Sequence, residues 1–300
     1  MSEARTSAWF GVVSAVALLL GEPAVLVVAA QDPDRETRQL WDDAFKKKRA
    51  QAKATAPSAG RPGSPSPPSE RPEAGPEDLL LGITVWRLRP LGPGEKGAAV
   101  WSTGAEVLTA ERVRVGTAFD VGERVRLSIE SARTGYLYLI DRERYGDGTL
   151  GEPYLIFPRS RIRGGDNKVS AGRIVEIPDL SDNPPFFTMK RTRPDQTGDV
   201  ITVLITPAPL SGVTGGAGAL KLSRDQVEQW ERRWSAPTKR IELAEGSGTL
   251  YTKAEHEAAG TSARLLAYDE PVPQTMYRID AKKGDPLVVT IPLGMKRDTP

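Results

Sequence analysis

The chain contains no cysteine and a single histidine among its 300 residues. Without cysteine, a disulfide framework, thiolate zinc sites, iron–sulfur clusters and a cysteine nucleophile are all excluded. A two-histidine metal site is excluded as well. The one histidine, His256, has Glu255 and Glu257 beside it, but sequence neighbours point to different sides of a helix and cannot share a metal with it. We therefore expect no catalytic residues, no metal ligands and no bound cofactor.

The chain also lacks a strong excess of charge of either sign. Lys and Arg number 41 against 39 Asp and Glu, which gives a formal net charge of +2. A protein whose main task is to neutralise phosphates is usually strongly basic on one face. We therefore expect no nucleic-acid partner.

The longest apolar run lies near the start of the chain. Residues 8–30 are almost wholly apolar, Arg5 precedes them, and small residues at 28–30 offer a cleavage site. This pattern predicts a signal peptide over residues 1–30 and a periplasmic or secreted protein with no stable membrane span after cleavage. The alternative is an uncleaved anchor, because roughly 20 apolar residues can span a bilayer; Glu22-Pro23 interrupts the run and weakens that alternative.

Residues 31–78 are expected to form a short amphipathic stub followed by a linker. Between residues 35 and 49, apolar side chains recur at helical spacing before a basic run, which fits either a frayed helical stub or a small patch for a partner or a membrane surface. Residues 50–76 are rich in Pro, Ala, Ser and Gly. Such a composition cannot bury enough apolar area to fold, so we expect a disordered tether.

Short strands with turn residues between them fill residues 79–211. The segment RVRLSIES (124–131) alternates cleanly, which predicts a half-buried strand with Val125, Leu127 and Ile129 inside and its charged residues on the solvent side. Short strands without long intervening helices favour an antiparallel β-sandwich, immunoglobulin-like or jelly-roll-like. The other strand candidates are GITVWRLR (82–89), YLYLI (136–140), PYLIFP (153–158), RIVEIP (173–178), FFTMKR (186–191) and DVITVLIT (199–206).

The pattern changes after residue 211, and we expect a C-terminal α+β lobe over residues 212–300. Ser223 is the expected N-cap of an amphipathic helix, with Gln226 as its capping-box partner, and the apolar face of this helix carries Val227, Trp230 and Trp234. Thr252 and Glu255 form the capping box of a second, short helix. The segment 276–293 is typical of two strands joined as a β-hairpin.

Two charged clusters are candidate sites in the middle of the chain. The first contains Asp141, Glu143, Asp147 and Glu152. These acids could hold calcium or serve glycoside hydrolysis, but Arg142 and Arg144 interleave with them, so we expect a self-neutralising loop. The second cluster is basic and uncompensated. It could grip an anionic polysaccharide, a lipid head group or an acidic partner, and its candidate contact residues are Arg159, Arg161, Arg163 and Lys168.

The run from Phe119 to Pro207 resembles a bacterial family known as domain of unknown function 4384. The residues that carry the resemblance are Phe119, Gly122, GYLYLID (135–141), Gly148, IFP (156–158), NKV (167–169), AG (171–172), EIP (176–178), Gly198 and VLITP (203–207). The resemblance implies a β-sandwich that serves as an accessory binding or sensing domain in exported or multidomain bacterial proteins. It brings no catalytic residues with it.

These observations together predict an exported bacterial, non-catalytic binding or accessory protein of the cell envelope. Its partner would be an envelope protein or an anionic polymer. The alternative is a hydrolase that acts on envelope polysaccharide through the carboxylates of residues 141–152. Two of these carboxyls facing each other in a cleft would favour the hydrolase.

Overall fold

The computed structural model describes Phe45 and residues 79–103, 106–243, 246–260, 273–282 and 284–297. The expected signal peptide lies outside these residues, and so does the expected linker apart from Phe45. No helix within the described ranges is long and apolar enough to cross a bilayer.

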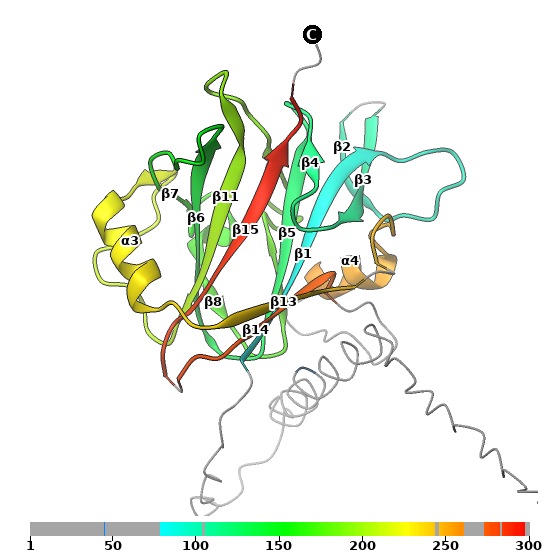
Figure 1. Cartoon of the computed structure of the whole chain (residues 1–300). Coiled ribbons are helices and arrows are strands. Elements are labelled where there is room, and N and C mark those ends of the chain that lie inside the picture. The colour runs from blue at the N-terminus through cyan, green and yellow to red at the C-terminus, as the bar shows by residue number, and fades with distance from the viewer. Residues whose placement is uncertain are drawn as a thin grey trace, which may run out of the picture. The chain divides into compact units, whose positions relative to one another are not determined.

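The described residues fold mainly into two β-sheets, which confirms the predicted β-sandwich (Figure 1). The first sheet follows the order β10 (Phe187–Thr188), β5 (Arg124–Ser131), β1 (Leu79–Pro90), β14 (Thr275–Ile279) and β13 (Thr238–Glu242), with β2 (Ala99–Thr103), β3 (Glu106–Val113) and β9 (Ile174–Ile177) off this path. The second follows β12 (Leu220–Lys221), β7 (Tyr154–Phe157), β6 (Gly135–Tyr145), β11 (Gln196–Thr206), β15 (Leu287–Met295) and β4 (Ala118–Phe119), with β8 (Lys168–Val169) beside β6.

The main core lies between the sheets and follows the two-residue period of the strands. Val125, Leu127 and Ile129 of β5 point into it, as their alternation predicts. From the other sheet, alternate apolar residues of β6, β11 and β15 meet them. Each fully buried aliphatic side chain of this kind contributes about 1.5–3 kcal/mol relative to exposure.

The other face of β5 is buried too, so the prediction that its charged residues face solvent is wrong. Arg126 is only 1% exposed, and Glu130 on the same face of the strand is also buried. Arg126 donates a hydrogen bond of 2.6 Å to Glu176 of β9, whose second carboxylate oxygen accepts from the Tyr251 hydroxyl at 2.9 Å. Tyr251 and the helix that follows it cover this face, and sequence alternation cannot reveal such a cover.

In the described part of the chain, an α-helix packs on the outer face of each sheet. α3 (Arg224–Arg233) lies beside β6 and β7 (Figure 1), and its Val227, Trp230 and Trp234 join an apolar cluster with Tyr138 and Leu204 of the sheet. The two indole rings stack with centroids 5.9 Å apart. The prediction that this helix packs its tryptophans onto an apolar surface is confirmed. The predicted capping box is not formed, because Ser223 occupies the N-cap position but its side chain makes no capping hydrogen bond.

α4 (Lys253–Gly260) has the predicted capping box. The Thr252 N–H donates to the Glu255 carboxylate at 2.9 Å, and the Glu255 N–H donates to the Thr252 hydroxyl at 3.1 Å. Glu255 also pairs with Arg112 of β3, and both side chains are buried. The cap therefore fixes the start of the helix and fastens it to the sheet.

The two C-terminal strands do not form the predicted β-hairpin. β14 pairs with β1 and β13 in the first sheet, whereas β15 pairs with β11 and β4 in the second. Both strands present apolar residues to the common core, so each is stabilised by its own sheet rather than by the other strand. Strands from both sides of the expected domain boundary at residue 212 therefore belong to the same two sheets.

Phe45 belongs to the amphipathic pattern at residues 35–49, and it is fully buried. It packs with Leu80 of β1, Met276 of β14 and Ala132. The pattern therefore supplies at least one aromatic side chain to the folded region, which neither interpretation of the stub anticipated.

Replacing Trp230 with alanine should lower the free energy of unfolding by about 1–3 kcal/mol, because a half-buried indole and its stacking partner lose contact. Urea unfolding followed by circular dichroism measures the change. Arg232→Ala, on the exposed side of the same helix, is the matched control and should change stability by less than about 0.5 kcal/mol. Equal effects of the two substitutions would contradict the packing of α3.

Candidate functional site

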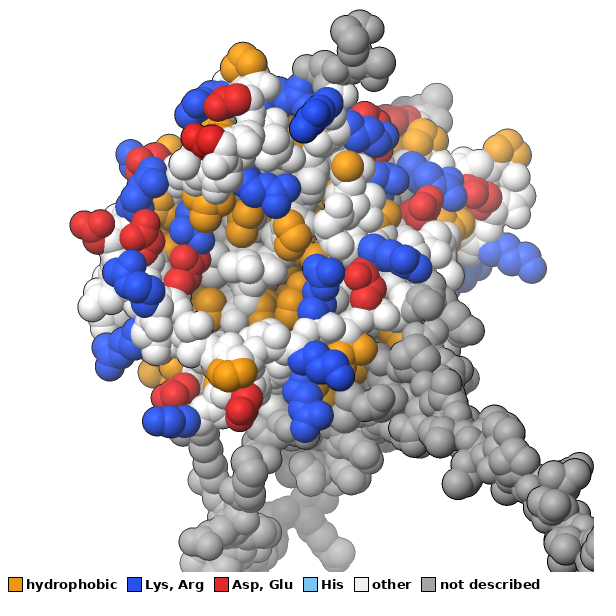
Figure 2. All heavy atoms as spheres, in the orientation of Figure 1, with side chains coloured by type: hydrophobic (Ala, Val, Ile, Leu, Met, Phe, Trp, Pro, Cys, Tyr) orange, Lys and Arg blue, Asp and Glu red, His pale blue; other side chains and the backbone are white. Residues whose placement is uncertain are grey.

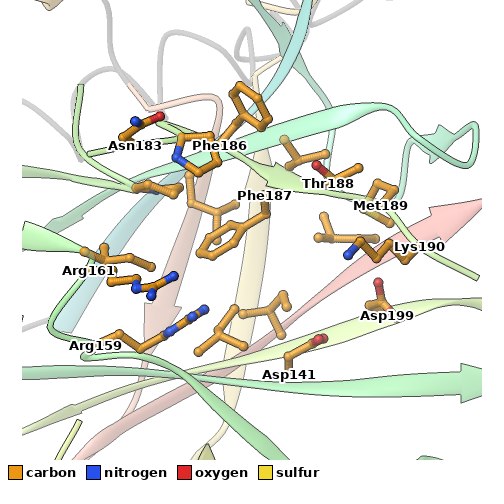
Figure 3. Close-up of a pocket in the computed structure, with 18 residues that line it drawn as sticks. Asp141, Arg159, Arg161, Asn183, Phe186, Phe187, Thr188, Met189, Lys190 and Asp199 are labelled. Atoms are coloured by element: carbon orange, nitrogen blue, oxygen red, sulfur yellow. The ribbon is translucent and has the colours of Figure 1, made fainter. Parts of the chain in front are cut away.

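A cavity of about 390 Å³ lies between the two sheets at the end where β5 and β10 face β6, β7 and β11. Figure 3 shows Arg159 and Arg161 on one side of it, Asp141 and Asp199 on another, and the Phe187 ring between them. Much of the wall is apolar. The apolar lining residues are Val125, Leu127, Ile156, Ile162, Pro178, Pro184, Phe186, Phe187, Met189, Ile201 and Leu293.

Two carboxylates continue the core-facing side of their strands into this cavity. On β6, Leu137 and Leu139 point into the core, and Asp141 follows at the same spacing. On β11, Asp199 precedes the core residue Ile201. Asp141 is paired with Ile201 across the two strands, so the acids are diagonal neighbours on one face.

A bulge in β11 sets the position of Asp199. The register with β6 shifts between Gln196 and Gly198. Gly198 has a φ of 151°, and a Cβ there would lie 2.2 Å from the Leu293 carbonyl oxygen of β15. Only glycine allows this close approach, which brings Asp199 into line with the core face.

Burial raises the pKa of both carboxyls. Desolvation, followed by the charges of Asp199 and Glu143, raises the pKa of Asp141 to about 8. Its Oδ1 atom is buried without a hydrogen-bond partner. Desolvation also raises the pKa of Asp199 to about 6, although Gln196 donates a hydrogen bond of 2.8 Å to its Oδ1. The free pocket therefore favours at least one protonated carboxyl at neutral pH.

The opposite side of the cavity carries two arginines, Arg159 and Arg161 (Figure 3). Arg159 donates to the Ala217 carbonyl at 3.0 Å, but its Nε atom is buried and unpartnered. Desolvation and the charge of Arg161 lower the pKa of Arg159. Among the residues that the structure describes, no carboxylate pairs with Arg159, Arg161 or the third lining cation, Lys190. By contrast, the face in Figure 2 shows positive and negative side chains intermixed.

The structure separates the four predicted basic contact residues. Arg159 and Arg161 line the cavity, whereas Arg163 and Lys168 do not. The Arg163 side chain pairs with Asp179 at 3.5 Å, and its backbone N–H donates to Asp182 at 2.9 Å. Arg163 therefore ties the two loops that border the cavity, and Lys168 is exposed on β8.

The acids of residues 141–152 do not form the expected self-neutralising loop, because none pairs with Arg142 or Arg144 in the described part of the chain. Adjacent residues of β6 lie on opposite faces, and Arg142 pairs instead with Glu231 of α3. Three of the acids have other partners. Glu143 accepts hydrogen bonds from the hydroxyls of Tyr145 and Thr192, and Asp147 accepts one from the Thr149 hydroxyl. Glu152 forms ion pairs with Lys221 and Arg224.

The remaining candidate from the sequence, His256, lies away from the cavity lining. His256 is exposed on α4 and lies edge-on to Tyr251, with ring centroids 6.2 Å apart. Within the described ranges, no group of three or more ligating side chains could hold a metal ion.

Sequence reasoning missed Asp199, Lys190 and the segment that includes Phe187. The sequence did contain a sign for Asp199. Asp199, Ile201 and Val203 occupy alternate positions of one strand, so the Asp199 carboxylate is on the same side as the apolar residues. The same alternation singles out Asp141 among the four acids of its cluster.

Residues 118–206 match the model of a family described as domain of unknown function DUF4384. The match confirms the resemblance over less than a third of the chain and contains every residue that lines the cavity except Leu293. No curated protein and no solved structure matches the chain.

Asp141→Asn should stabilise the protein at alkaline pH by about 1–3 kcal/mol. Because the folded-state pKa of Asp141 is raised, the carboxyl favours the fold most at low pH, and this contribution is lost as the pH rises toward about 8. Asparagine stays neutral, so the gain should be largest near pH 9 and should vanish below about pH 4. Urea unfolding at several pH values measures it.

Asp147→Asn is the matched control for this measurement. Hydrogen bonds from Thr149 lower the pKa of Asp147, so its contribution is present above the unfolded pKa and is lost only in acid. The control should therefore destabilise by a constant amount between about pH 6 and 9. A pH-independent effect of Asp141→Asn over the same range would contradict the burial of its charge.

Proposed function

We propose that this chain is an exported, non-catalytic binding protein of the bacterial cell envelope, and that its pocket takes a small ligand with an anionic group. Arg159 and Arg161 would hold that group. The observation that carries the proposal is the pair of neighbouring guanidinium groups on the cavity wall without a counter-ion among the described residues. An anion between them would relieve their repulsion and give the buried Nε of Arg159 an acceptor.

The size and lining of the cavity support a small ligand over a polymer chain. Pockets for small molecules have volumes of about 300–1,000 Å³ and mostly apolar walls with a few polar groups. This cavity, at about 390 Å³, lies near the lower limit and has that lining. A volume of this size would admit the charged end of an envelope polymer or protein, but not a long stretch of it.

Export is supported by the apolar run at residues 8–30 and by the Pro-rich stretch that follows it. The absence of cysteine in the whole chain is compatible with an oxidising compartment, where a free thiol would be at risk. In this proposal the Pro-rich stretch is a tether for the sandwich.

A carboxylate-dependent hydrolase is the second candidate, because Asp141 and Asp199 share the cavity and both have raised pKa values. A glycosidase needs one protonated and one ionised carboxyl on either side of a sugar. Here the acids are diagonal neighbours on one sheet, so they present one acidic surface rather than two opposed ones. This geometry favours binding over hydrolysis.

The binding proposal is tested by titrating the mature chain, residues 31–300, with 4-phenylbutyrate and with its neutral amide. Isothermal titration calorimetry should detect the carboxylate and show binding of the amide weakened by about tenfold or more, because the charge-assisted hydrogen bonds are lost. Arg159→Gln with Arg161→Gln should weaken carboxylate binding to the level of the amide.

Lys168→Gln is the control, because Lys168 is exposed and lies outside the cavity. It should leave the affinity unchanged. Equal loss in the control and in the double variant, or equal affinity for the carboxylate and the amide, would contradict the assignment of the two arginines. Hydrolysis of envelope polysaccharide that disappears in Asp141→Asn would favour the second candidate.

A further inference from the structure

The two charged sides of the cavity face a single space, and the ligand must satisfy both. We propose that the ligand is a zwitterion with an apolar middle, of the class of short peptides, with its carboxylate at Arg159 and Arg161 and its ammonium group at Asp141 and Asp199. This inference rests on the proposed function for the carboxylate end. The ammonium end is carried by separate observations.

One of the two carboxylate oxygens of Asp141 lacks a hydrogen-bond donor, although the backbone N–H of Arg142 donates to this carboxylate. Its Oδ1 atom is buried and unpartnered, although buried polar atoms in folded proteins are nearly always hydrogen-bonded. An ammonium group has three donors and no acceptor, so it matches two neighbouring carboxylates. A ligand cation would supply both the missing donor and the missing positive charge.

The protein's own groups do not fill this role. Glu143 is a third acid on the same face, but its two oxygens are already engaged by the hydroxyls of Tyr145 and Thr192 at 2.6 Å each. Lys190 lines the cavity and forms no ion pair among the described residues. Asp141 and Asp199 therefore keep acceptor capacity for a ligand.

The space between the charged ends suits an apolar side chain. Phe187 lies between the two sides in Figure 3, and Ile156 and Met189 line the same space. A backbone with one or two apolar side chains would cover this surface while its termini reach the charged groups. The volume of about 390 Å³ limits the ligand to a few residues.

The affinity should depend on pH in a way that identifies the ammonium contact. The charged groups around Asp141 are Asp199 of β11 and Glu143 of its own strand, Lys190 on the same side of the cavity as the two aspartates, and Arg159 and Arg161 across the cavity (Figure 3). An ammonium group binds the ionised carboxyls, so affinity should fall as the pH drops through their titration. It should fall again above about pH 8, where an α-amino group loses its proton.

Calorimetric titration with the peptides Leu-Phe and Leu-Gly-Phe tests the inference, with the mature chain as the protein. Each peptide is compared with its N-acetyl form and with its C-terminal amide, which remove one charge each. We expect the free peptide to bind about tenfold or more tightly than either capped form. Near neutral pH, binding should also release protons, measured by repeating the titration in buffers of different ionisation enthalpy.

The variants separate this inference from the proposed function. Asp141→Asn should remove the preference for the free amine over the N-acetyl form and flatten the acid side of the pH profile, while Lys168→Gln should change neither. N-acetyl peptides that bind as tightly as free peptides would overturn the ammonium contact and leave the arginine site standing. Amides that bind as tightly as free peptides would instead overturn the arginine site. Failure of all the peptides to bind would overturn the peptide assignment, and the phenylbutyrate titration would then decide the proposed function alone.

Discussion

The partial burial of two carboxylates, Asp141 and Asp199, on the core side of β6 and β11 is the constraint on which the pocket depends. A sandwich core normally excludes charge, because moving a carboxylate out of water raises its free energy unless partners compensate. Asp141 and Asp199 nevertheless continue the register of Leu139 and Ile201. They fit there because their carboxyl groups border a cavity at this end of the sandwich, whereas the rest of the core is filled with packed apolar side chains.

The buried ion pair between Arg126 and Glu176, on the outer face of the first sheet, is connected by hydrogen bonds to the wall of this cavity. Arg126 donates to the Pro178 carbonyl at 3.1 Å as well as to Glu176, and Pro178 is a lining residue. The Asp182 carboxylate then accepts the N–H groups of Asp179 and Arg163 at 2.6 and 2.9 Å. This chain of contacts holds the loop after β9 against the loop that carries Arg159 and Arg161. Such preorganisation lowers the cost of ordering the site when a ligand binds.

Local patterns were sufficient to predict the sandwich class, the strand at residues 124–131, the tryptophan face of α3 and the capping box of α4. Each depends on residues close in sequence. The patterns did not predict what covers a strand from outside, so Arg126 was expected in solvent although Tyr251 and α4 bury it. The prediction of a C-terminal hairpin was wrong for a similar reason, because β14 and β15 pair with strands that are distant in the sequence. At the site, the basic cluster supplied two lining arginines. The alternation of Asp199 with Ile201 and Val203 was visible in the sequence, but only the pairing of β6 with β11 shows that Asp199 is a diagonal neighbour of Asp141.

The central claim is that Asp141 and Asp199 share a desolvated pocket, and carboxyl carbon NMR titration measures this most directly. The 13C signals of the two side chains can be assigned with Asp141→Asn and Asp199→Asn and followed from about pH 3 to 10. Both carboxyls should titrate well above the ordinary aspartate value of about 3.9, with Asp141 the higher of the two. Titration of both near 3.9 would contradict the claim.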